Sequence, residues 1–362
     1  MFDIEIDAPT PDLSSLQAIT VAVAGAGWYG CHIASALKSQ GVEVVVFEKN
    51  DELFSEASGN NQFRLHLGLH YARSAATRHQ SRDGYHRFVE RYPRLSRPVN
   101  DNIYLVPRFE SLIDFETYFS IMLASGISID RVPLNQMPFL NATAFEGAIR
   151  CDERVILTTQ AREHFRRKLN GSVRLGERIE DLSRTASGLL VNGRPFDLLI
   201  DATWGALHPA RDVFFEPTLL LYYRYRGGGT LFPAITLVDG PLASIYPTEW
   251  PGLYTLSSVC HTPLARCASK AEAYAVLARF DSEQVQAKRK LMEDEIRAYV
   301  PALTDLFEFE GPQFAIKTKP QGRSDNRACT VNCHDRVISV QSGKIDNIFF
   351  ATDRILGHVL SN

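Results

Sequence analysis

The feature that most restricts the fold of this chain is a glycine-rich turn with the sequence GAGWYG at residues 25–30. It follows an apolar run at residues 18–24 that reads as a short buried strand, and it precedes a helical pattern. In this setting Gly25 permits a tight turn, Gly27 lets the backbone approach a pyrophosphate, and Gly30 lets the helix pack closely on the sheet. The order of strand, glycine turn and helix therefore predicts a Rossmann-type dinucleotide-binding domain.

An acidic residue one strand later strengthens this prediction. The Val-rich run at residues 42–47 is typical of a parallel strand covered on both faces, and Glu48 ends it, 21 residues after Gly27. A carboxylate at this position can accept hydrogen bonds from both hydroxyls of an adenosine ribose, and its charge repels a 2′-phosphate. NADP is therefore disfavoured, while the residues alone leave both FAD and NAD open.

The rest of the chain indicates a second, interleaved domain. A buried strand at residues 197–202 resembles the first two strands, whereas the alternating aromatic segments at residues 218–263 indicate an antiparallel sheet. Asp281 and Gln284 form a capping-box pattern that predicts a helix. We therefore expect an α/β (α+β overall) fold, with a Rossmann-type FAD/NAD(P)-binding domain around a parallel sheet and a substrate-binding domain with an antiparallel sheet and helices. The expected boundaries are residues 17–100, 145–210 and 322–362 for the cofactor domain, and 101–144 and 211–321 for the substrate domain.

Composition and charge limit the kinds of binding partner and indicate a cellular location. A net charge of -3 and a pI near 6.4 give no general attraction for nucleic acid or for an anionic membrane. The first sixteen residues carry four acids and no Lys or Arg, unlike a secretory signal, so we expect a cytoplasmic protein. The six cysteines are sparse, and Cys260 and Cys333, each followed by a histidine, fit no standard zinc site. Reduced thiols and no bound metal are expected.

A polar loop after the second strand carries the most specific resemblance. Residues 58–71, with the sequence SGNNQFRLHLGLHY, resemble the flavin-facing loop of the D-amino acid oxidase superfamily of FAD-dependent oxidoreductases, nearest to its L-2-hydroxyglutarate oxidase-like branch. The resemblance implies that the loop lies under the isoalloxazine ring of FAD. The side chains of Ser58, Asn60, Asn61 and Gln62 are also suited to pyrophosphate and ribityl oxygens.

Two further segments match the superfamily in their order along the chain. Residues 201–205 resemble its Ala-Thr-Gly element, although Trp204 interrupts that pattern. Residues 347–353 resemble the closing strand whose terminal acid, here Asp353, hydrogen-bonds a ribityl hydroxyl, and Thr352 replaces the usual glycine. The residues expected to bind FAD are Gly25, Gly27, Trp28, Tyr29, Gly30, Glu48, Lys49, Ser58, Asn60, Asn61, Gln62, Thr203, Trp204, Gly205 and Asp353.

The resemblance also implies an activity, in which flavin N5 takes hydride from a carbon that bears oxygen or nitrogen. The expected enzyme is an FAD-dependent dehydrogenase or oxidase of a small polar metabolite, such as a hydroxy acid or an amine. The protein must orient the substrate and take up the proton that the oxidation releases. The catalytic candidates are His66, His70 and Tyr71 in the flavin-facing loop, and Arg224 and Arg323 as clamps for a carboxylate or phosphate.

Three other readings stay open. A flavin monooxygenase would consume NADPH and insert oxygen. The sequence lacks the Asp-Gly element familiar from such enzymes and a Gly-Asp near the end of the chain. A non-redox isomerase similar to UDP-galactopyranose mutase would use the arginines for the diphosphate of a nucleotide sugar. A flavin-binding protein without turnover is the third. We expect a small-molecule substrate and neither a nucleic acid nor a membrane as partner, and a homodimer is left open.

Overall fold

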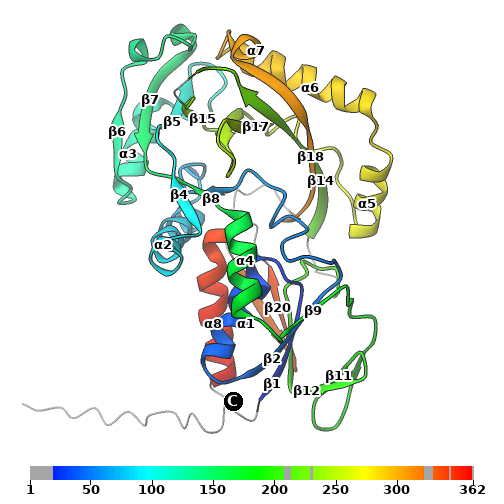
Figure 1. The fold of residues 1–362 in the computed structure, drawn as a ribbon. Helices are drawn as coiled ribbons and strands as arrows, with labels where there is room; N and C mark the ends of the chain where they lie inside the picture. Colours follow the sequence, from blue (N-terminus) through cyan, green and yellow to red (C-terminus); the bar gives the residue numbers. More distant parts are fainter. Residues whose placement is uncertain (1–18, 208–212, 229–230, 322–328, 342–343, 361–362) are drawn as a thin grey trace, which may run out of the picture.

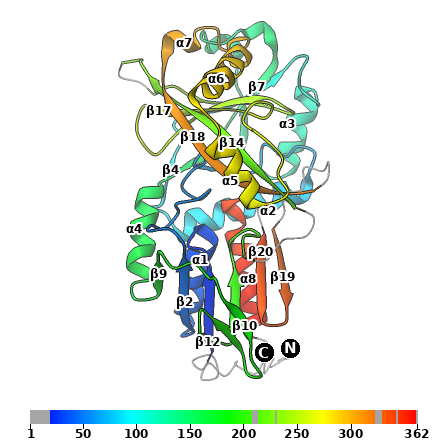
Figure 2. The same cartoon turned by 90° about the vertical axis from the view of Figure 1, so that its right-hand side faces the viewer.

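The computed structural model of this protein describes residues 19–207, 213–228, 231–321, 329–341 and 344–360. The chain forms two large sheets, one in each half of the molecule, with a small three-stranded sheet near their junction (Figure 1). Turning the molecule by 90° shows the same two-part arrangement (Figure 2). This is the expected mixed α/β fold, with the glycine turn of residues 25–30 at the junction of the two parts.

The first sheet has the strand order β19-β20-β13-β1-β2-β9 and is parallel except for β19. Its strands are β1 (Thr20–Ala24), β2 (Glu43–Glu48), β9 (Val173–Leu175), β13 (Leu198–Asp201), β19 (Thr330–His334) and β20 (Val337–Gln341). Helices α1 (Trp28–Ser39), α2 (Ala75–Arg91), α4 (Thr158–Lys168) and α8 (Ile348–Leu360) belong to this half. Because both faces of the central strand are covered, β1 reads as an unbroken apolar run: Val21 and Val23 pack into the helix-side core, and Ala22 and Ala24 into a core shared with a β-meander.

That meander consists of β10 (Leu182–Arg184), β11 (Leu189–Val191) and β12 (Arg194–Phe196). The small sheet near the junction has the order β3-β8-β4, from β3 (Arg64–Leu65), β4 (Ser96–Pro98) and β8 (Arg154–Ile156). It joins the loop at residues 58–71 to the segment that returns from the second sheet.

The second sheet has eight strands in the order β18-β14-β17-β16-β15-β5-β7-β6, and its pairs are antiparallel except for β15 with β5. These are β5 (Asn102–Pro107), β6 (Ile129–Arg131), β7 (Phe145–Cys151), β14 (Val213–Tyr225), β15 (Ala234–Leu237), β16 (Ala243–Pro247), β17 (Leu253–Ser258) and β18 (Phe307–Pro320). Helices α3 (Phe115–Ala124), α5 (Lys270–Ala278), α6 (Ser282–Arg297) and α7 (Leu303–Leu306) lie in this half, with 3₁₀ turns at Leu134–Gln136 and Ala142–Ala144. The capping box at Asp281 and Gln284 is present at the start of α6, as expected.

Two expectations about local structure differ from the fold. Residues 145–151 were placed in the cofactor domain, whereas β7 pairs with β5 and β6 in the second sheet. Residues 347–353 were expected to form a closing strand, but a 3₁₀ turn at Ile345–Asn347 leads directly into α8. Ile348, Ala351, Ile355 and Val359 are buried at helical spacing, so the apolar run that suggested a strand is the inward face of a helix.

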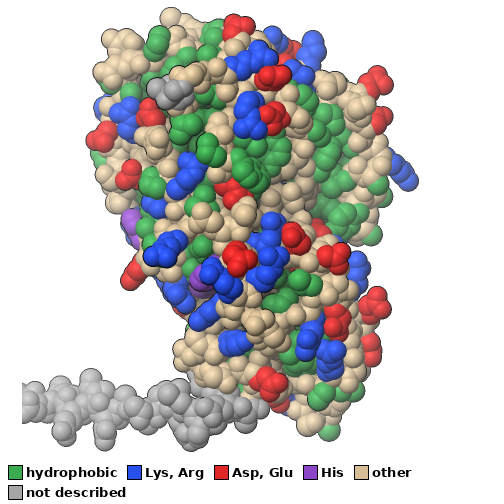
Figure 3. Space-filling model, in the orientation of Figure 1, with side chains coloured by type: hydrophobic (Ala, Val, Ile, Leu, Met, Phe, Trp, Pro, Cys, Tyr) green, Lys and Arg blue, Asp and Glu red, His purple; other side chains and the backbone are tan. Residues whose placement is uncertain are grey.

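The surface carries positive charge near the junction of the two halves (Figure 3). Figure 3 shows several Lys and Arg side chains near the junction on the face that is drawn. Among the described residues, no helix is both long and apolar enough to cross a bilayer.

Candidate active site

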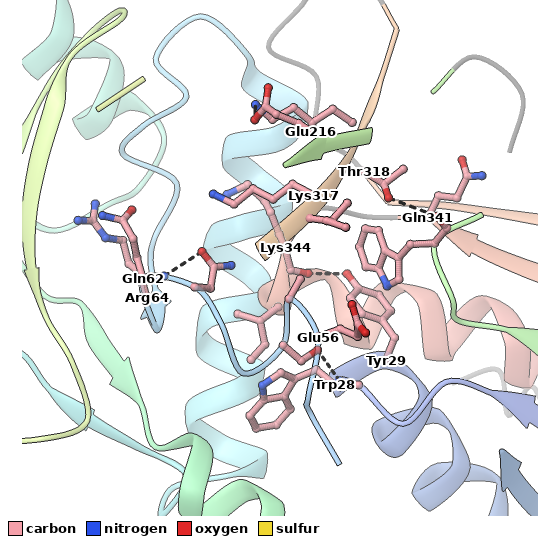
Figure 4. Close-up of a pocket in the computed structure, with 18 of the residues that line it drawn as sticks. Trp28, Tyr29, Glu56, Gln62, Arg64, Glu216, Lys317, Thr318, Gln341 and Lys344 are labelled. Carbon is pink, nitrogen blue, oxygen red and sulfur yellow. Dashed lines mark hydrogen bonds and ion pairs between the residues drawn. The ribbon is translucent and has the colours of Figure 1, made fainter. Parts of the chain in front are cut away.

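A cavity of about 1100 Å³ lies between the two large sheets (Figure 4). Its walls come from the turn after β1, the ends of β2 and β13, the loop at residues 54–73, and strands β14 to β18. Pockets for drug-sized ligands measure roughly 300–1,000 Å³. This cavity therefore has room for a dinucleotide together with a small substrate.

The glycine turn is packed too closely for larger residues. An ideal Cβ on Gly30 would lie 1.8 Å from the carbonyl oxygen of Gly25, and one on Gly27 would lie 2.7 Å from Ser58 Oγ. Gly25 itself has a φ of +93°, in the region that favours glycine. Gly27 has no side chain to cap α1, and Ser58 Oγ accepts the Trp28 N–H at 3.1 Å. Gly27, Trp28 and Tyr29 line the cavity, so the positive dipole end of the helix faces it and suits a phosphate.

Glu48 is held rigidly at the end of β2. Its Oε2 accepts a hydrogen bond of 2.8 Å from the backbone N–H of Ala26, and its Oε1 accepts one of 2.7 Å from Asn50 Nδ2. The side chain lines the cavity, beside Lys49, which pairs with Glu56 at 2.6 Å. This is the position from which a carboxylate can accept the ribose hydroxyls of an adenine dinucleotide.

The expected flavin-facing loop follows the cavity wall. Ser58, Asn61 and Gln62 line the cavity, and Gln62 Nε2 donates to the hydroxyls of Ser244 (2.9 Å) and Ser257 (2.8 Å) on the second sheet. Asn60 is not in the lining, because its Nδ2 closes the loop by donating to the carbonyl oxygens of residues 55 and 56. The loop thus spans both halves of the site.

The two aromatic residues of the glycine turn have different surroundings. Trp28 is 3% exposed and stacks on Phe54 at 5.0 Å, so most of its ring serves the core. The Tyr29 hydroxyl donates a 2.5 Å hydrogen bond to the carbonyl oxygen of Lys344, as Figure 4 shows. The turn is therefore tied to the segment before α8.

The segment after β13 also reaches the cavity. Thr203 Oγ1 donates to Asp201 Oδ1 at 2.6 Å, and Thr203 and Trp204 line the cavity while Gly205 does not. Trp204 takes a φ of +63° and places its ring edge-on to Tyr29 at 5.5 Å.

Two further expected site residues lie away from the cavity. Asp353 is on α8 and forms an exposed ion pair with Arg87, so its expected hydrogen bond to a ribityl hydroxyl is wrong. Arg224 pairs with Glu310 at 2.5 Å and lies outside the lining. It stands near the end of β14, and the opposite end of this strand, at Val213 and Glu216, faces the cavity. Arg323 lies outside the described residues.

A cluster of cations and imidazoles forms one wall of the cavity. His66 Nε2 lies 2.5 Å from Lys344 Nζ, and His70 Nε2 lies 2.6 Å from Arg64 Nη1. The Arg64 guanidinium also donates to Thr236 Oγ1 at 2.9 Å, and the Lys344 nitrogen lies 4.0 Å from the ring centre of Tyr71. All of these side chains line the cavity (Figure 4 labels Arg64 and Lys344).

Burial and neighbouring charge keep both imidazoles neutral. Burial and then the Lys344 charge hold the pKa of His66 well below its ordinary value, and burial and then Arg64 do the same for the pKa of His70. His66 Nδ1 accepts the Gly68 N–H at 3.0 Å, and its Nε2 faces Lys344 Nζ.

Some hydrogen-bond donors of Arg64 have no acceptor among the described residues. Its Nε and Nη2 are buried and have no hydrogen-bond partner among the described residues, although the side chain lies at the cavity wall and over the ring of Tyr246, 3.9 Å from its centre. Buried guanidinium donors without acceptors are costly, and an anionic group would satisfy them.

His66, His70 and Glu153 bring possible ligand atoms within 4.8 Å of one another. The cations Lys344 and Arg64 already lie against the Nε2 atoms of the two imidazoles. Their positive charge would repel a metal cation bound between these side chains.

The sequence interpretation found the glycine turn, Glu48 and the histidine loop, but it passed over Arg64, Lys344 and Glu153. Arg64 stands within the quoted loop, where a cation in an otherwise apolar stretch was an available signal. Lys344 and Glu153 carry no local motif.

The geometry fits FAD. The start of α1 faces the cavity, the Cβ positions that would block close approach are absent at Gly27 and Gly30, and Glu48 is in place for a ribose. The family model described as FAD dependent oxidoreductase (DAO) matches residues 20–310.

Similar sequences agree with this match. The chain is 48% identical to FAD-dependent monooxygenase FPY4 of Fusarium mangiferae over 338 residues, which cover 93% of this chain and 90% of that protein. It is 26% identical over 373 residues to FAD-dependent monooxygenase kojA of Aspergillus flavus, covering 93% of this chain and 85% of that protein.

Solved structures share the fold at low identity. L-alpha-glycerophosphate oxidase from Mycoplasma pneumoniae, solved with FAD bound, superposes with a TM-score of 0.73 at 13% identity, covering 95% of both chains. Glycine oxidase from Geobacillus kaustophilus gives a TM-score of 0.70 at 16% identity, covering 94% of both chains.

Proposed function

We infer the activity from one premise: this chain belongs to the DAO family of FAD-dependent oxidoreductases, and it is therefore an FAD-dependent enzyme. We propose that it oxidises a small polar metabolite, such as a hydroxy acid or an amine, that carries an anionic group. The observation that carries this proposal is Arg64, which stands at the cavity wall with two buried nitrogen atoms lacking acceptors among the described residues. A carboxylate or a comparable oxyanion supplies such acceptors, in pairs and with opposite charge.

The cofactor-binding part of the proposal uses the other end of the cavity. The turn at Gly25 and Gly27 and the start of α1 would hold the pyrophosphate, Glu48 the adenosine ribose, and Ser58 and Asn61 the oxygens nearer the flavin. When bound, FAD supplies the redox chemistry of the reaction.

The His66–Lys344 pair is suited to take the proton that an oxidation releases. His66 Nε2 and Lys344 Nζ lie 2.5 Å apart, and both side chains line the cavity. Such a pair can remove a proton from a substrate hydroxyl or ammonium group.

Anaerobic mixing of the yellow holoenzyme with single substrates tests the proposal. Hydroxy acids and amino acids should bleach the flavin absorbance without any added nicotinamide nucleotide, and their amides, which lack the carboxylate, should not. If the amides bleach the flavin as fast as the acids, an anionic substrate is excluded.

Monooxygenation is a second candidate, because the two similar sequences from Fusarium mangiferae and Aspergillus flavus are named as FAD-dependent monooxygenases. The same experiment separates it from the first. A monooxygenase that depends on NADPH would stay oxidised with substrate alone, would be reduced when NADPH is added, and would place labelled oxygen from O₂ in its product.

A further inference from the structure

A chain of hydrogen bonds runs from the cavity wall into the core. Arg64 Nη1 lies 2.6 Å from His70 Nε2, His70 Nδ1 lies 3.1 Å from the Tyr104 hydroxyl, and that hydroxyl donates to Glu153 Oε1 at 2.7 Å. Arginine can only donate, so His70 Nε2 must accept and its proton must be on Nδ1. Every donor in the chain therefore points away from Arg64 and toward Glu153.

Glu153 is a buried carboxyl group that the proposed reaction does not use. It stands between β7 and β8, is 1% exposed and does not line the cavity. Its Oε2 has no hydrogen-bond partner among the described residues. A buried carboxylate with one oxygen unsatisfied is poorly stabilised as an anion, so a modest change in the charge around it can protonate it.

Several groups that surround Glu153 are held uncharged near neutral pH by burial. Burial keeps the tyrosines and the thiol neutral, since it raises the pKa of each: Tyr104 on β5, Tyr246 on β16, Tyr118 on α3, Tyr85 on α2, and Cys151 on β7. On the cavity side stand Arg64 and Lys344, with the neutral imidazoles of His66 and His70, and Asp152 and Arg154 flank Glu153 along the chain.

Before a ligand binds, Glu153 is the carboxyl group at the end of the hydrogen-bonded chain that starts at the Arg64 guanidinium. An anionic group bound at Arg64 would place two negative charges about one cation in a medium of low dielectric constant. Protonation of Glu153 removes that repulsion. The bound anion then keeps its own charge and remains paired with the Arg64 guanidinium.

We propose that the binding of an anionic group at Arg64 is coupled to the uptake of one proton by Glu153. The inference rests on the proposed function, because it takes Arg64 as the anion site, but it adds a proton to the binding equilibrium. Burial raises the pKa of Glu153 to about 7, with the Arg64 charge opposing the rise. Near that pH about half of the unliganded molecules hold the proton, so binding should take up about half a proton per site.

The coupling predicts a definite dependence of affinity on pH. The dissociation constant of an anionic ligand should be constant below about pH 6 and should rise up to about tenfold per pH unit above about pH 7, because the proton must then come from solution. An uncharged ligand should show no such rise.

The experiment uses the FAD-loaded enzyme, with acetate as the anionic probe and acetamide as its uncharged counterpart. Acetate is fully ionised over the range studied, and binding is followed by the change in flavin absorbance, with proton uptake measured by an indicator dye in weak buffer. In wild type the acetate dissociation constant should rise with pH and protons should be taken up. In Glu153→Gln the constant should stay at the low-pH value of wild type, without proton uptake.

Tyr104→Phe supplies a second variant in case Glu153→Gln fails to fold. Removing the hydroxyl takes a hydrogen bond from the Glu153 carboxylate, so the rise in dissociation constant should begin at a higher pH than in wild type. A pH slope in Glu153→Gln equal to that of wild type, or an unmoved onset in Tyr104→Phe, would overturn the coupling.

The outcomes separate this inference from the proposed function. If acetate binds wild type but without pH dependence or proton uptake, the coupling is wrong and the anion site stands. If acetate binds no better than acetamide, or binds Arg64→Met as tightly as wild type, the anion site itself is wrong.

Discussion

Replacing Gly30 with alanine should remove FAD binding and destabilise the protein, although alanine is the better helix former. Gly30 lies in the first turn of α1, and its Cβ would be 1.8 Å from the carbonyl oxygen of Gly25, where about 3.4 Å is an ordinary contact. The obstacle is backbone, so no side chain can rotate away. Either α1 or the turn that faces the pyrophosphate must move by about 1.5 Å.

The size of the effect follows from two opposing contributions. Overpacking of this kind lowers the free energy of unfolding by about 1–3 kcal/mol or more. The higher helix propensity of alanine raises it by at most about 1 kcal/mol. The free energy of unfolding should therefore fall by about 2 kcal/mol. FAD affinity should fall further, by about a hundredfold or more, because the N–H groups of the turn no longer converge on the phosphates.

Gly357→Ala is the matched control. Gly357 is also helical, near the end of α8, and a Cβ there would meet no heavy atom within 4 Å. This variant should keep FAD and gain up to about 1 kcal/mol of stability. Urea unfolding gives the stabilities, and quenching of flavin fluorescence gives the FAD dissociation constants. If Gly30→Ala keeps wild-type FAD affinity and gains stability as the control does, the role assigned to the close contact is refuted.

Three further changes test other parts of the site. Glu48→Gln should weaken FAD binding about tenfold, since it replaces a charge-assisted hydrogen bond to ribose with a neutral one, and an unchanged dissociation constant would remove Glu48 from the site. Arg64→Met should raise the dissociation constant of acetate about 10- to 100-fold, while Arg224→Met, which breaks an exposed pair with Glu310, should leave it unchanged; equal effects would contradict the assignment. The folded protein raises the pKa of Glu153 from 4.5 to about 7, so this group should cost about 3 kcal/mol of stability as the pH rises from about 4.5 to about 7. Glu153→Gln should lack that loss in urea unfolding at pH 5 and pH 8, and parallel pH dependences in the two proteins would disprove it.

The nucleotide end of the site could be predicted because its requirements are local. The glycine turn, the strand before it and Glu48 lie within 29 residues, and each has a physical reason at its own position in the chain. The helix at α6 was predicted for the same reason, because Asp281 and Gln284 cap it through contacts three residues apart.

The errors arose where a local pattern fitted two structures. Residues 347–353 are apolar enough for a buried strand, and only the continuation of the pattern to Ile355 and Val359 gives them helical spacing. Arg224 was placed at the site because a guanidinium can clamp an anion, but the residue type does not predict how far along β14 the cavity lies.

The polar end of the site depends on pairings that no local pattern contains. Lys344 and His66 are 278 residues apart, and Tyr104 and Glu153 are 49 apart. The pairing of β3 with β8 sets Leu65 opposite Arg154 and Arg64 opposite Val155, so the register of a two-residue strand brings Arg64 near Glu153. Because side chains alternate along a strand, a slip of one residue would turn Arg64 to the other face and separate it from the His70–Tyr104 chain. The positions of the buried charges are therefore a property of strand register, which is fixed only when both halves of the chain have folded together.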